Sequence, residues 1–449
     1  MVAPDSVTIR SLDEIVQYYR SINPARNLFV GIEWERSGVF AKTLEPVQYA
    51  GPQGYNAVLH KLVDEVGWEI VQHEGEDIYE LQRGQTRITI EGDGRLELAG
   101  SPQEIVHDLA REFRIHSHEV EEIGKALGIT WMPMGLQPLH SNEQISLVGK
   151  ARYSIFKDVG DPDLMATMTR RTNGLTANLS FTNEENAIKK AQTAFRVLPI
   201  VSAMFACSPF DQGALTSNLD LRRKVIQNHC PERTGIPPNI LDDGFCLKDW
   251  LKYYADLPVI LVSENSKQVR PDGDFSFQQW MENGYRDRFP TLKDFDQHIK
   301  TTWSDMRLRP AYLEYRVADS VPFRSVLALP ALMKGLLFDS DSWRTVAELT
   351  EDWTYEEIID MDRRSWTGGL STDVRGVSLR MYAQEALLLA NEKLRGFSRM
   401  NAENADERIY LQPLKEQIFI KEESFAEELS RLFTTEWNGN IRNLLSWCA

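Results

Sequence analysis

The chain contains three stretches in which apolar and polar residues alternate with a period of two, the pattern of a half-buried β-strand. They span residues 27–40, 87–100 and 311–320. Glutamates occupy polar positions in each stretch, and residues two apart on a strand point to the same side. These glutamates are Glu33, Glu35, Glu91, Glu97 and Glu314. The middle stretch is predicted as a hairpin, because a Gly-Asp-Gly turn separates its two halves.

Each acid also has an ordinary explanation when its own stretch is taken alone. Glu33 and Glu35 fit an exposed sheet edge. The hairpin acids fit a solvated surface, and Glu314 fits a weak cross-strand ion pair with the neighbouring Arg316. These explanations stay open unless the three stretches share a sheet.

Apolar residues that recur every three to four positions predict helices elsewhere in the chain. The predicted helices span 11–21, 53–66, from Ser101-Pro102 to about 127, and 183–207, with further helices beyond about residue 323. Residues 174–181 and 257–263 are predicted as further strands. Residues 211–245 are predicted as an irregular, loop-rich segment, because Asp, Gly, Pro and basic residues interrupt any period.

A chain of 449 residues is expected to form either two domains or one large domain with insertions. Its 42% hydrophobic and 26% charged residues are typical of a globular protein. A formal charge of −16 without a basic cluster argues against nucleic acid or an anionic membrane as a partner. The start lacks a signal-peptide pattern, and no apolar run approaches the roughly 20 residues of a membrane span, so a cytoplasmic protein is expected.

Five carboxylates on one sheet would repel one another, and divalent cations would relieve that repulsion. Oxygen-only ligands suit Mg²⁺ or Mn²⁺, and Mg²⁺ usually keeps water and substrate phosphates as its remaining ligands. With Arg316 nearby to meet phosphate oxygens, the set fits nucleotide-dependent phosphoryl transfer. The chain has neither a GxxxxGK[ST] loop nor a kinase-type GxGxxG with a downstream catalytic Asp, which excludes the P-loop and protein-kinase arrangements.

A succession of motifs makes this interpretation specific. In order along the chain they are GIEWER (31–36), ITIEGDGRLELAGSP (88–102), NLSF (178–181), FACSPF (205–210), ERTGIPP (232–238), LDDGF (241–245) and YLEYRVAD (312–319). Their order and spacing resemble the plant and proteobacterial type of glutamate–cysteine ligase, roughly from residue 8 to the C-terminal helices.

This resemblance implies an α+β fold, in which an antiparallel sheet curves into a funnel with helices outside, related to glutamine synthetase and guanidino kinases. It implies one large catalytic domain over residues 1–449, mostly helical from about 323. It also implies ATP, Mg²⁺, glutamate and an amine acceptor such as cysteine. In the implied reaction the γ-carboxylate of glutamate attacks the γ-phosphate of ATP, and the amine then displaces phosphate from γ-glutamyl phosphate.

The resemblance also carries residue roles to matching positions. The implied metal ligands are Glu33, Glu35, Glu91, Glu97 and Glu314. Arg316 resembles the family's phosphate-binding arginine, and Arg316 and Glu97 are the expected catalytic residues. The implied substrate-binding residues are Arg152, Tyr153, Thr176, Asn178, Arg222 and Arg233.

The chain departs from the family at the wall of the expected acceptor pocket. Thr176 stands where the family usually has a glutamine, and Trp34 replaces a common histidine between the two acids of the first stretch. The shorter Thr176 should enlarge or rewire that wall, which leaves the identity of the amine open. The alternatives are a γ-glutamyl ligase with another amine, a guanidino-type phosphotransferase and a non-catalytic paralogue that binds a small molecule.

Overall fold

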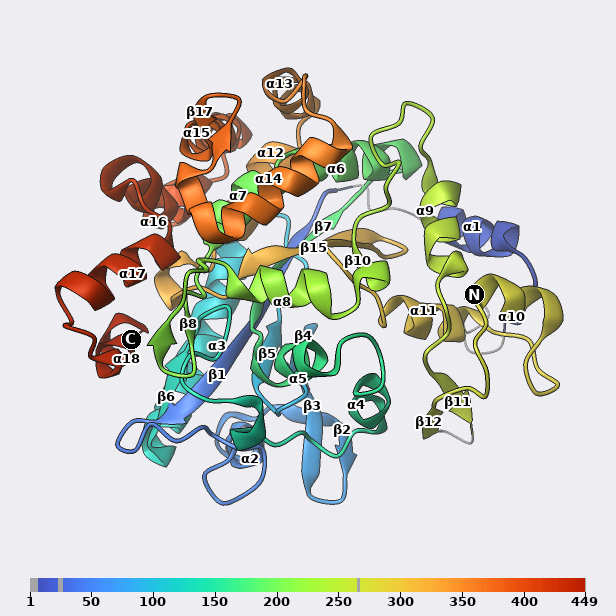
Figure 1. The fold of residues 1–449 in the computed structure, drawn as a ribbon, viewed down its shortest axis with the longest axis horizontal. Helices are drawn as coiled ribbons and strands as arrows, with labels where there is room; N and C mark the ends of the chain where they lie inside the picture. The colour runs from blue at the N-terminus through green and yellow to red at the C-terminus, as the bar shows by residue number, and fades with distance from the viewer. Residues whose placement is uncertain (1–6, 23–26, 265–266, 449) are drawn as a thin grey trace.

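The computed structural model describes residues 7–22, 27–264 and 267–448, and within them the chain is built around one nine-stranded sheet (Figure 1). The strands follow one another across the sheet in the order β14 (Met306–Leu308), β15 (Tyr312–Asp319), β7 (Gly174–Ser180), β1 (Val30–Phe40), β5 (Leu96–Ala99), β4 (Thr86–Ile90), β3 (Asp77–Arg83) and β2 (Glu69–Glu74). The ninth strand, β6 (Ile129–Met132), pairs with the far end of β1. Every pair in this sheet is antiparallel, as the sequence predicted.

Helices surround the sheet. Before the last long strand they are α1 (Leu12–Ser21), α2 (Tyr55–Val66), α3 (Val106–Leu127), α4 (Ala151–Phe156), α5 (Pro162–Arg171), α6 (Glu184–Arg196), α7 (Leu198–Phe205), α8 (Leu221–His229), α9 (Leu247–Asp256), α10 (Phe277–Asn283) and α11 (Leu292–Ile299). After it come α12 (Ala328–Leu337), α13 (Ser340–Leu349), α14 (Tyr355–Gly368), α15 (Leu379–Phe397), α16 (Gln412–Lys415), α17 (Phe425–Thr435) and α18 (Leu444–Cys448). This second group, orange to red in Figure 1, gathers on one side of the sheet.

Short strand pairs join the connecting segments. They are β8 (Phe210–Asp211) with β9 (Ala214–Leu215), β10 (Thr234–Gly235) with β13 (Trp303–Ser304), β11 (Val262–Glu264) with β12 (Lys267–Val269), and β16 (Asp373–Val374) with β17 (Val377–Ser378).

The central strand β1 shows why the two faces of the sheet differ. Its apolar residues Val30, Ile32 and Trp34 are buried in the same hydrophobic cluster as alternate residues of β7 and β15. Helices α6, α7 and α12 pack against these strands. Because side chains alternate along a strand, Glu33 and Glu35 must leave β1 on the other face.

Three sequence predictions of local structure were wrong. The long helix opens at Val106 and not at Ser101-Pro102, because the intervening residues pair with β1 through a bridge between Val30 and Gln103. The stretch 257–263 is a strand only at its end, in β11. The segment 211–245 contains the helix α8, whose first turn is capped by the Asp220 carboxylate.

The strand β2 forms one end of the sheet. All six of its residues are exposed, including Ile70 and Val71. Its pairing with β3 shifts register on both sides of Gln72, so the strand is bulged.

Candidate active site

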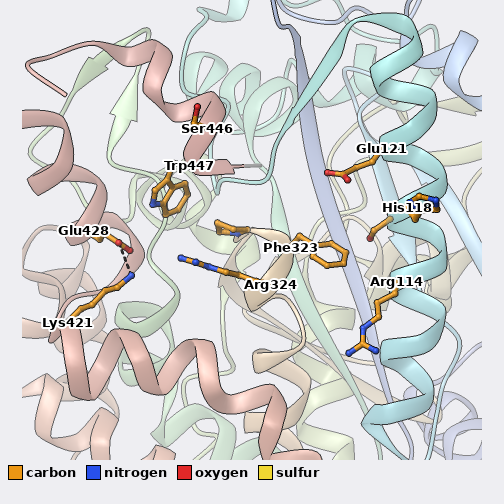
Figure 2. Close-up of a pocket in the computed structure, with 11 residues that line it drawn as sticks. Arg114, His118, Glu121, Phe323, Arg324, Lys421, Glu428, Ser446 and Trp447 are labelled. Atoms are coloured by element: carbon orange, nitrogen blue, oxygen red, sulfur yellow. Dashed lines mark hydrogen bonds and ion pairs between the residues drawn. The ribbon is translucent and has the colours of Figure 1, made fainter. Parts of the chain in front are cut away.

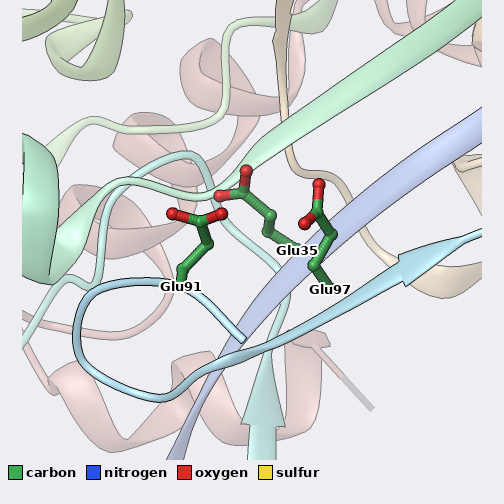
Figure 3. Close-up of side chains that lie close together, drawn as sticks. All are labelled: Glu35, Glu91 and Glu97. Carbon is green, nitrogen blue, oxygen red and sulfur yellow. The ribbon is translucent and has the colours of Figure 1, made fainter. Parts of the chain in front are cut away.

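Three of the predicted acids meet on the polar face of the sheet. Glu35 of β1 and Glu97 of β5 lie directly opposite each other in the strand register, and Glu91 follows the last residue of β4. One carboxylate oxygen from each of the three lies within 4.8 Å of the other two. Figure 3 shows the three side chains converging above the sheet. We call this set the acid trio.

The turn between β4 and β5 fixes Glu91. The Glu91 N–H donates to the carbonyl of Arg95 at 3.1 Å, and the Gly94 N–H donates to the carbonyl of Glu91 at 2.9 Å. Gly94 has a φ of +90°, which favours glycine. A Cβ at Gly92 would lie 2.3 Å from the carbonyl oxygen of Thr169, so no other residue fits there without a shift of the backbone.

Neutral and cationic donors hold the other two members of the trio. The Thr89 hydroxyl donates to Glu97 Oε2 at 2.5 Å. The Gly174 N–H donates to Glu35 Oε2 at 3.0 Å, and Arg95 lies 3.4 Å from the same oxygen. Arg95 is itself buried and ion-paired with Asp93 at 2.6 Å. Both strands therefore present their carboxylates in fixed directions.

The trio carries more negative charge than its neighbours neutralise. Burial, together with Glu33, Glu91 and Glu35, raises the pKa of Glu97 well above its ordinary value. Burial also raises the pKa of Glu35, and Arg95 offsets this only in part. A divalent cation would relieve the repulsion, and three carboxylate oxygens are the ligand type that Mg²⁺ prefers. The residues therefore fit a magnesium ion.

Glu33 lies next to the trio on the same face of β1. It accepts a hydrogen bond from Asn178 Nδ2 at 3.0 Å, while the buried Asn178 Oδ1 has no partner among the described residues. Burial and the nearby Glu314 raise the pKa of Glu33. Thr176 is opposite Glu33 in the register of β7 and β1. Thr176 and Asn178 thus face the acids, as the sequence predicted for their strand.

Glu314 differs from the other acids because arginines surround it. Arg307 lies 2.7 Å from its carboxylate, Arg309 3.4 Å and Arg316 3.5 Å. Burial works against the charge, but these guanidinium groups outweigh it, and the pKa of Glu314 falls below its ordinary value. Glu314 is therefore ionised and already paired.

Arg316 lies at the centre of the charged groups. Burial works against its charge, whereas Glu314, Glu33 and Glu35 raise its pKa. Its N–H donates to the carbonyl of Asp305 at 2.9 Å, where the pairing of β15 with β7 shifts register. The bulge thus helps to place a guanidinium among the acids.

Arg152 and Tyr153 lie on the Glu91 side of the site. Arg152 donates to the Tyr153 hydroxyl at 2.7 Å, and its pKa rises because Tyr153 and Glu91 outweigh the effect of burial. The neighbouring Lys150 stacks over the ring of Tyr79, and burial with Arg152 lowers its pKa to about 8. These residues bring positive charge to the edge of the trio.

Arg222 and Arg233 have mainly backbone partners. Arg222 donates to the carbonyls of Val317 at 3.4 Å and Ala318 at 3.2 Å, which lie in the bulged part of β15. Arg233 donates to Thr301 and to the carbonyl of Pro258. Neither guanidinium hydrogen-bonds to a member of the trio, so their substrate-binding role stays a prediction.

Sequence analysis missed several charged residues around the site. They are Arg95, Lys150, Arg307 and Arg309. Arg307 of β14 and Arg309 in the turn that follows it did leave a signal, because MRLRPAYLEYR alternates on both sides of a proline turn and can be read as a hairpin. That pattern would have placed Arg307 opposite Glu314.

A model of the family described as "Glutamate-cysteine ligase family 2(GCS2)" matches residues 29–446. The chain belongs to glutamate–cysteine ligase family 2. It is therefore an ATP-dependent ligase, as the resemblance implied. The matched span includes all five acids and every helix from α2 to α17.

Members of this family in plants resemble the chain over most of its length. The chain is 30% identical over 439 residues to glutamate–cysteine ligase A, chloroplastic, of Oryza sativa subsp. indica, covering 96% of this chain and 86% of that protein. It is 33% identical over 378 residues to the chloroplastic enzyme of Solanum lycopersicum, covering 82% and 71%. A crystal structure of glutamate–cysteine ligase from Francisella tularensis in complex with AMP matches with a TM-score of 0.57 at 12% identity, covering 95% of this chain and 88% of that one. The last comparison confirms the fold class.

The prediction of a cytoplasmic location was wrong. The family members from rice, Brassica juncea and Arabidopsis thaliana are named chloroplastic, which points to the plastid. The prediction rested on the absence of a secretory signal pattern, and plastid targeting uses a different kind of segment. Among the described residues, none of the helices combines the length and the apolar character that crossing a membrane requires.

Proposed function

We propose that this ligase joins the γ-carboxylate of glutamate to the amine of cysteine, with γ-glutamyl phosphate as intermediate. The observation that carries the proposal is the acid trio with Arg316 on the same sheet face. A nucleophilic carboxylate and ATP repel each other, so the main task of such a site is to neutralise charge and align the reactants. The plant relatives, which are named glutamate–cysteine ligases, support this choice of substrates.

In this proposal Glu35, Glu91 and Glu97 hold Mg²⁺, which supplies neutralisation of the ATP phosphates when it is bound. Glu33 and Glu314 remain proposed metal ligands beside the trio. Their carboxylates are near each other, because, besides burial, the charge of Glu314 raises the pKa of Glu33. Mn²⁺ would suit the same oxygen donors.

The chain's own cations act on the phosphates. Arg316 is close to the acids and its side chain is partly exposed, so it can donate to the transferring phosphoryl group. Arg152 and Tyr153 approach from the Glu91 side and are proposed to contact substrate there. Arg222 and Arg233 are proposed to act by holding β15 and the loop at Pro258 in place.

We also propose that the whole chain acts as one catalytic domain. The largest hydrophobic cluster includes residues from Ile9 in the N-terminal segment to Cys448 in α18. The mostly helical part beyond residue 323 contributes α12 to this cluster, against β1 and β7. A shared core of this kind supports a single folding unit.

The test is release of phosphate from ATP, Mg²⁺ and glutamate, measured across cysteine, 2-aminobutyrate, other amino acids and small amines, with the mass of each product. We expect γ-glutamylcysteine as the preferred product. Preference for another amine would keep the ligase chemistry and replace the acceptor. If none of the acceptors in the screen supports ATP cleavage, the proposal is contradicted and the alternative of a non-catalytic binding protein is favoured.

Thr176 is the residue most suited to a test of the acceptor pocket. Thr176→Gln places a longer amide opposite Glu33, and we expect it to change the order of preferred amines more than the apparent affinity for ATP. Thr176→Val, which keeps the shape of the side chain, is the matched control. Identical acceptor profiles for wild type and Thr176→Gln would show that residue 176 does not line the acceptor pocket.

A further inference from the structure

A cavity near the C-terminus lies away from the acid trio. It has a volume of about 600 Å³ and lies between α3, the turn at Pro322–Arg324 and the C-terminal helices (Figure 2). An adjoining cavity shares Phe323 and Ser117 with it and reaches Trp34. Trp34 stands between Glu33 and Glu35 on β1 and points to the apolar face. The cavity is therefore behind the sheet, on the side opposite the acids.

Aromatic rings form part of the cavity wall. Phe323 is 41% exposed although its ring stacks on buried Phe113, with centroids 4.9 Å apart and planes 22° from parallel. Trp447 of α18 lines the cavity beyond Arg324. An exposed phenylalanine and a tryptophan offer flat surfaces against which a ring can stack.

The cavity carries a net positive charge, because the guanidinium groups of Arg114 and Arg324 face one carboxylate, that of Glu121, which is also without an ion pair among the described residues. Neither Arg114 of α3 nor Arg324 has an ion pair or side-chain hydrogen bond to any residue in the described part of the chain. In Figure 2, Arg324 extends toward Trp447, and Arg114 projects from α3 on the other side of Phe323. By contrast, Lys421 at the same cavity is paired with Glu428 at 2.8 Å. Two free guanidinium groups in a chain of net charge −16 favour an anion at this place.

Buried polar atoms at the cavity also lack partners. The Ser117 side chain is 3% exposed, lines both cavities, and its hydroxyl has no partner among the described residues. Trp34 is also 3% exposed. The indole Nε1 of Trp34 and that of Trp447 likewise have no hydrogen-bond partner among the described residues. Buried polar groups are normally hydrogen-bonded, so these donors are available to a ligand.

We propose that this cavity is a second ligand site, which binds a small organic anion with a flat ring. The anionic group would meet Arg324 or Arg114, which lie on either side of Phe323; the ring would stack against Phe323 and Trp447, and Ser117 would donate or accept a hydrogen bond. The volume is within the range of about 300–1,000 Å³ that is usual for small-molecule sites. The site shares no residue with the acid trio, and the proposal does not depend on which amine the ligase uses.

The test is isothermal titration calorimetry of the full chain with 1-naphthyl phosphate, in the absence of ATP and metal. Two comparison compounds are 1-naphthol, which lacks the anion, and inorganic phosphate, which lacks the ring. We expect 1:1 binding of 1-naphthyl phosphate and at least about tenfold weaker binding of both comparison compounds, a difference of about 1.4 kcal/mol. A further titration with 1-naphthoate distinguishes a phosphate from a carboxylate as the preferred anion.

Variants locate the binding. The double variant Arg114→Gln/Arg324→Gln should bind 1-naphthyl phosphate at least about tenfold more weakly than the wild type. The double variant Arg114→Lys/Arg324→Lys should keep part of the affinity. Arg111→Gln is the matched control, because Arg111 is an exposed arginine of the same helix that pairs with Asp108. Arg316→Gln tests the other site and should leave the binding unchanged. Equal binding by the double glutamine variant, or its loss in Arg316→Gln, would overturn the proposal.

Discussion

We expect replacement of Glu97 by glutamine to lower the rate of ATP cleavage by about 10²- to 10³-fold, the size of effect seen when one electrostatic group of a reaction site is removed. Glutamine keeps the volume of the side chain and removes the charge. Glu97 lies opposite Glu35 and within 4.8 Å of the other carboxylates of the trio, so its replacement would remove one of the three proposed ligands of Mg²⁺. The measurement is phosphate release over a range of Mg²⁺ concentrations.

The same variant should fold as well as the wild type. Burial and three neighbouring acids already raise the pKa of Glu97, which means that its charge is costly in the free protein. Removal of one of several mutually repelling buried charges is expected to leave the thermal midpoint equal or higher. Loss of activity together with an unchanged melting curve therefore separates a role in chemistry from a role in folding.

Glu80→Gln is the matched control. Glu80 projects from the same sheet face two strands away, across Thr89 from Glu97, and pairs with the exposed Arg87 at 2.7 Å. We expect less than about a threefold change in activity, since the Arg87 side chain is exposed and an ion pair with a solvated partner contributes at most about 1 kcal/mol. Wild-type turnover of Glu97→Gln at limiting Mg²⁺ would exclude Glu97 as a metal ligand.

Replacement of Arg223 by glutamine should cost about 3–5 kcal/mol in the free energy of unfolding. Arg223 is 2% exposed and joins three parts of the chain, because it bonds Asp305 with both of its terminal nitrogens and Asp362 of α14 at 2.7 Å. Glutamine would leave two buried carboxylates without a cation. Urea denaturation monitored by circular dichroism measures the loss.

Arg364→Gln provides the control for this prediction. Arg364 lies on α14, the helix that carries Asp362. It pairs with Asp360 at 2.7 Å, but both side chains of this pair are about half exposed. Loss of this ion pair should lower the free energy of unfolding by less than about 1 kcal/mol. A similar cost for both variants would mean that burial of the Arg223 cluster does not determine its contribution.

The sequence predicted the strands of the site well because alternation is a local property. Ile88 and Leu98 are buried, while Thr89 and Glu97 stand on the polar face of the same hairpin, so the period of two alone located the acids. The resemblance then implied that these strands share one antiparallel sheet, which no single stretch contains; the order of the strands comes from the structure. The pairing of Glu35 with Glu97 follows from β1 lying next to β5.

The sequence analysis could not predict contacts between residues that are far apart along the chain. Arg222, Arg223 and Lys224 looked like part of a loop because charged residues gave no apolar stripe, yet α8 forms and buries Arg223 against carboxylates far along the chain. The sequence analysis also missed two of the arginines around Glu314, since Arg307 of β14 and Arg309 of the following turn reach it only when β14 pairs with β15. The cavity behind Trp34 is lined by helical residues that are at least 80 positions away in sequence, so no local pattern could predict it.

The end strand β2 bears on the solubility of the whole molecule. An exposed edge with Ile70 and Val71 could pair with the same edge of a second chain and start aggregation. The register shifts beside Gln72 interrupt the straight row of backbone groups that such pairing needs, and Glu69 and Glu74 put like charges at both ends of the strand. A sheet open at this edge can therefore remain unpaired at high protein concentration.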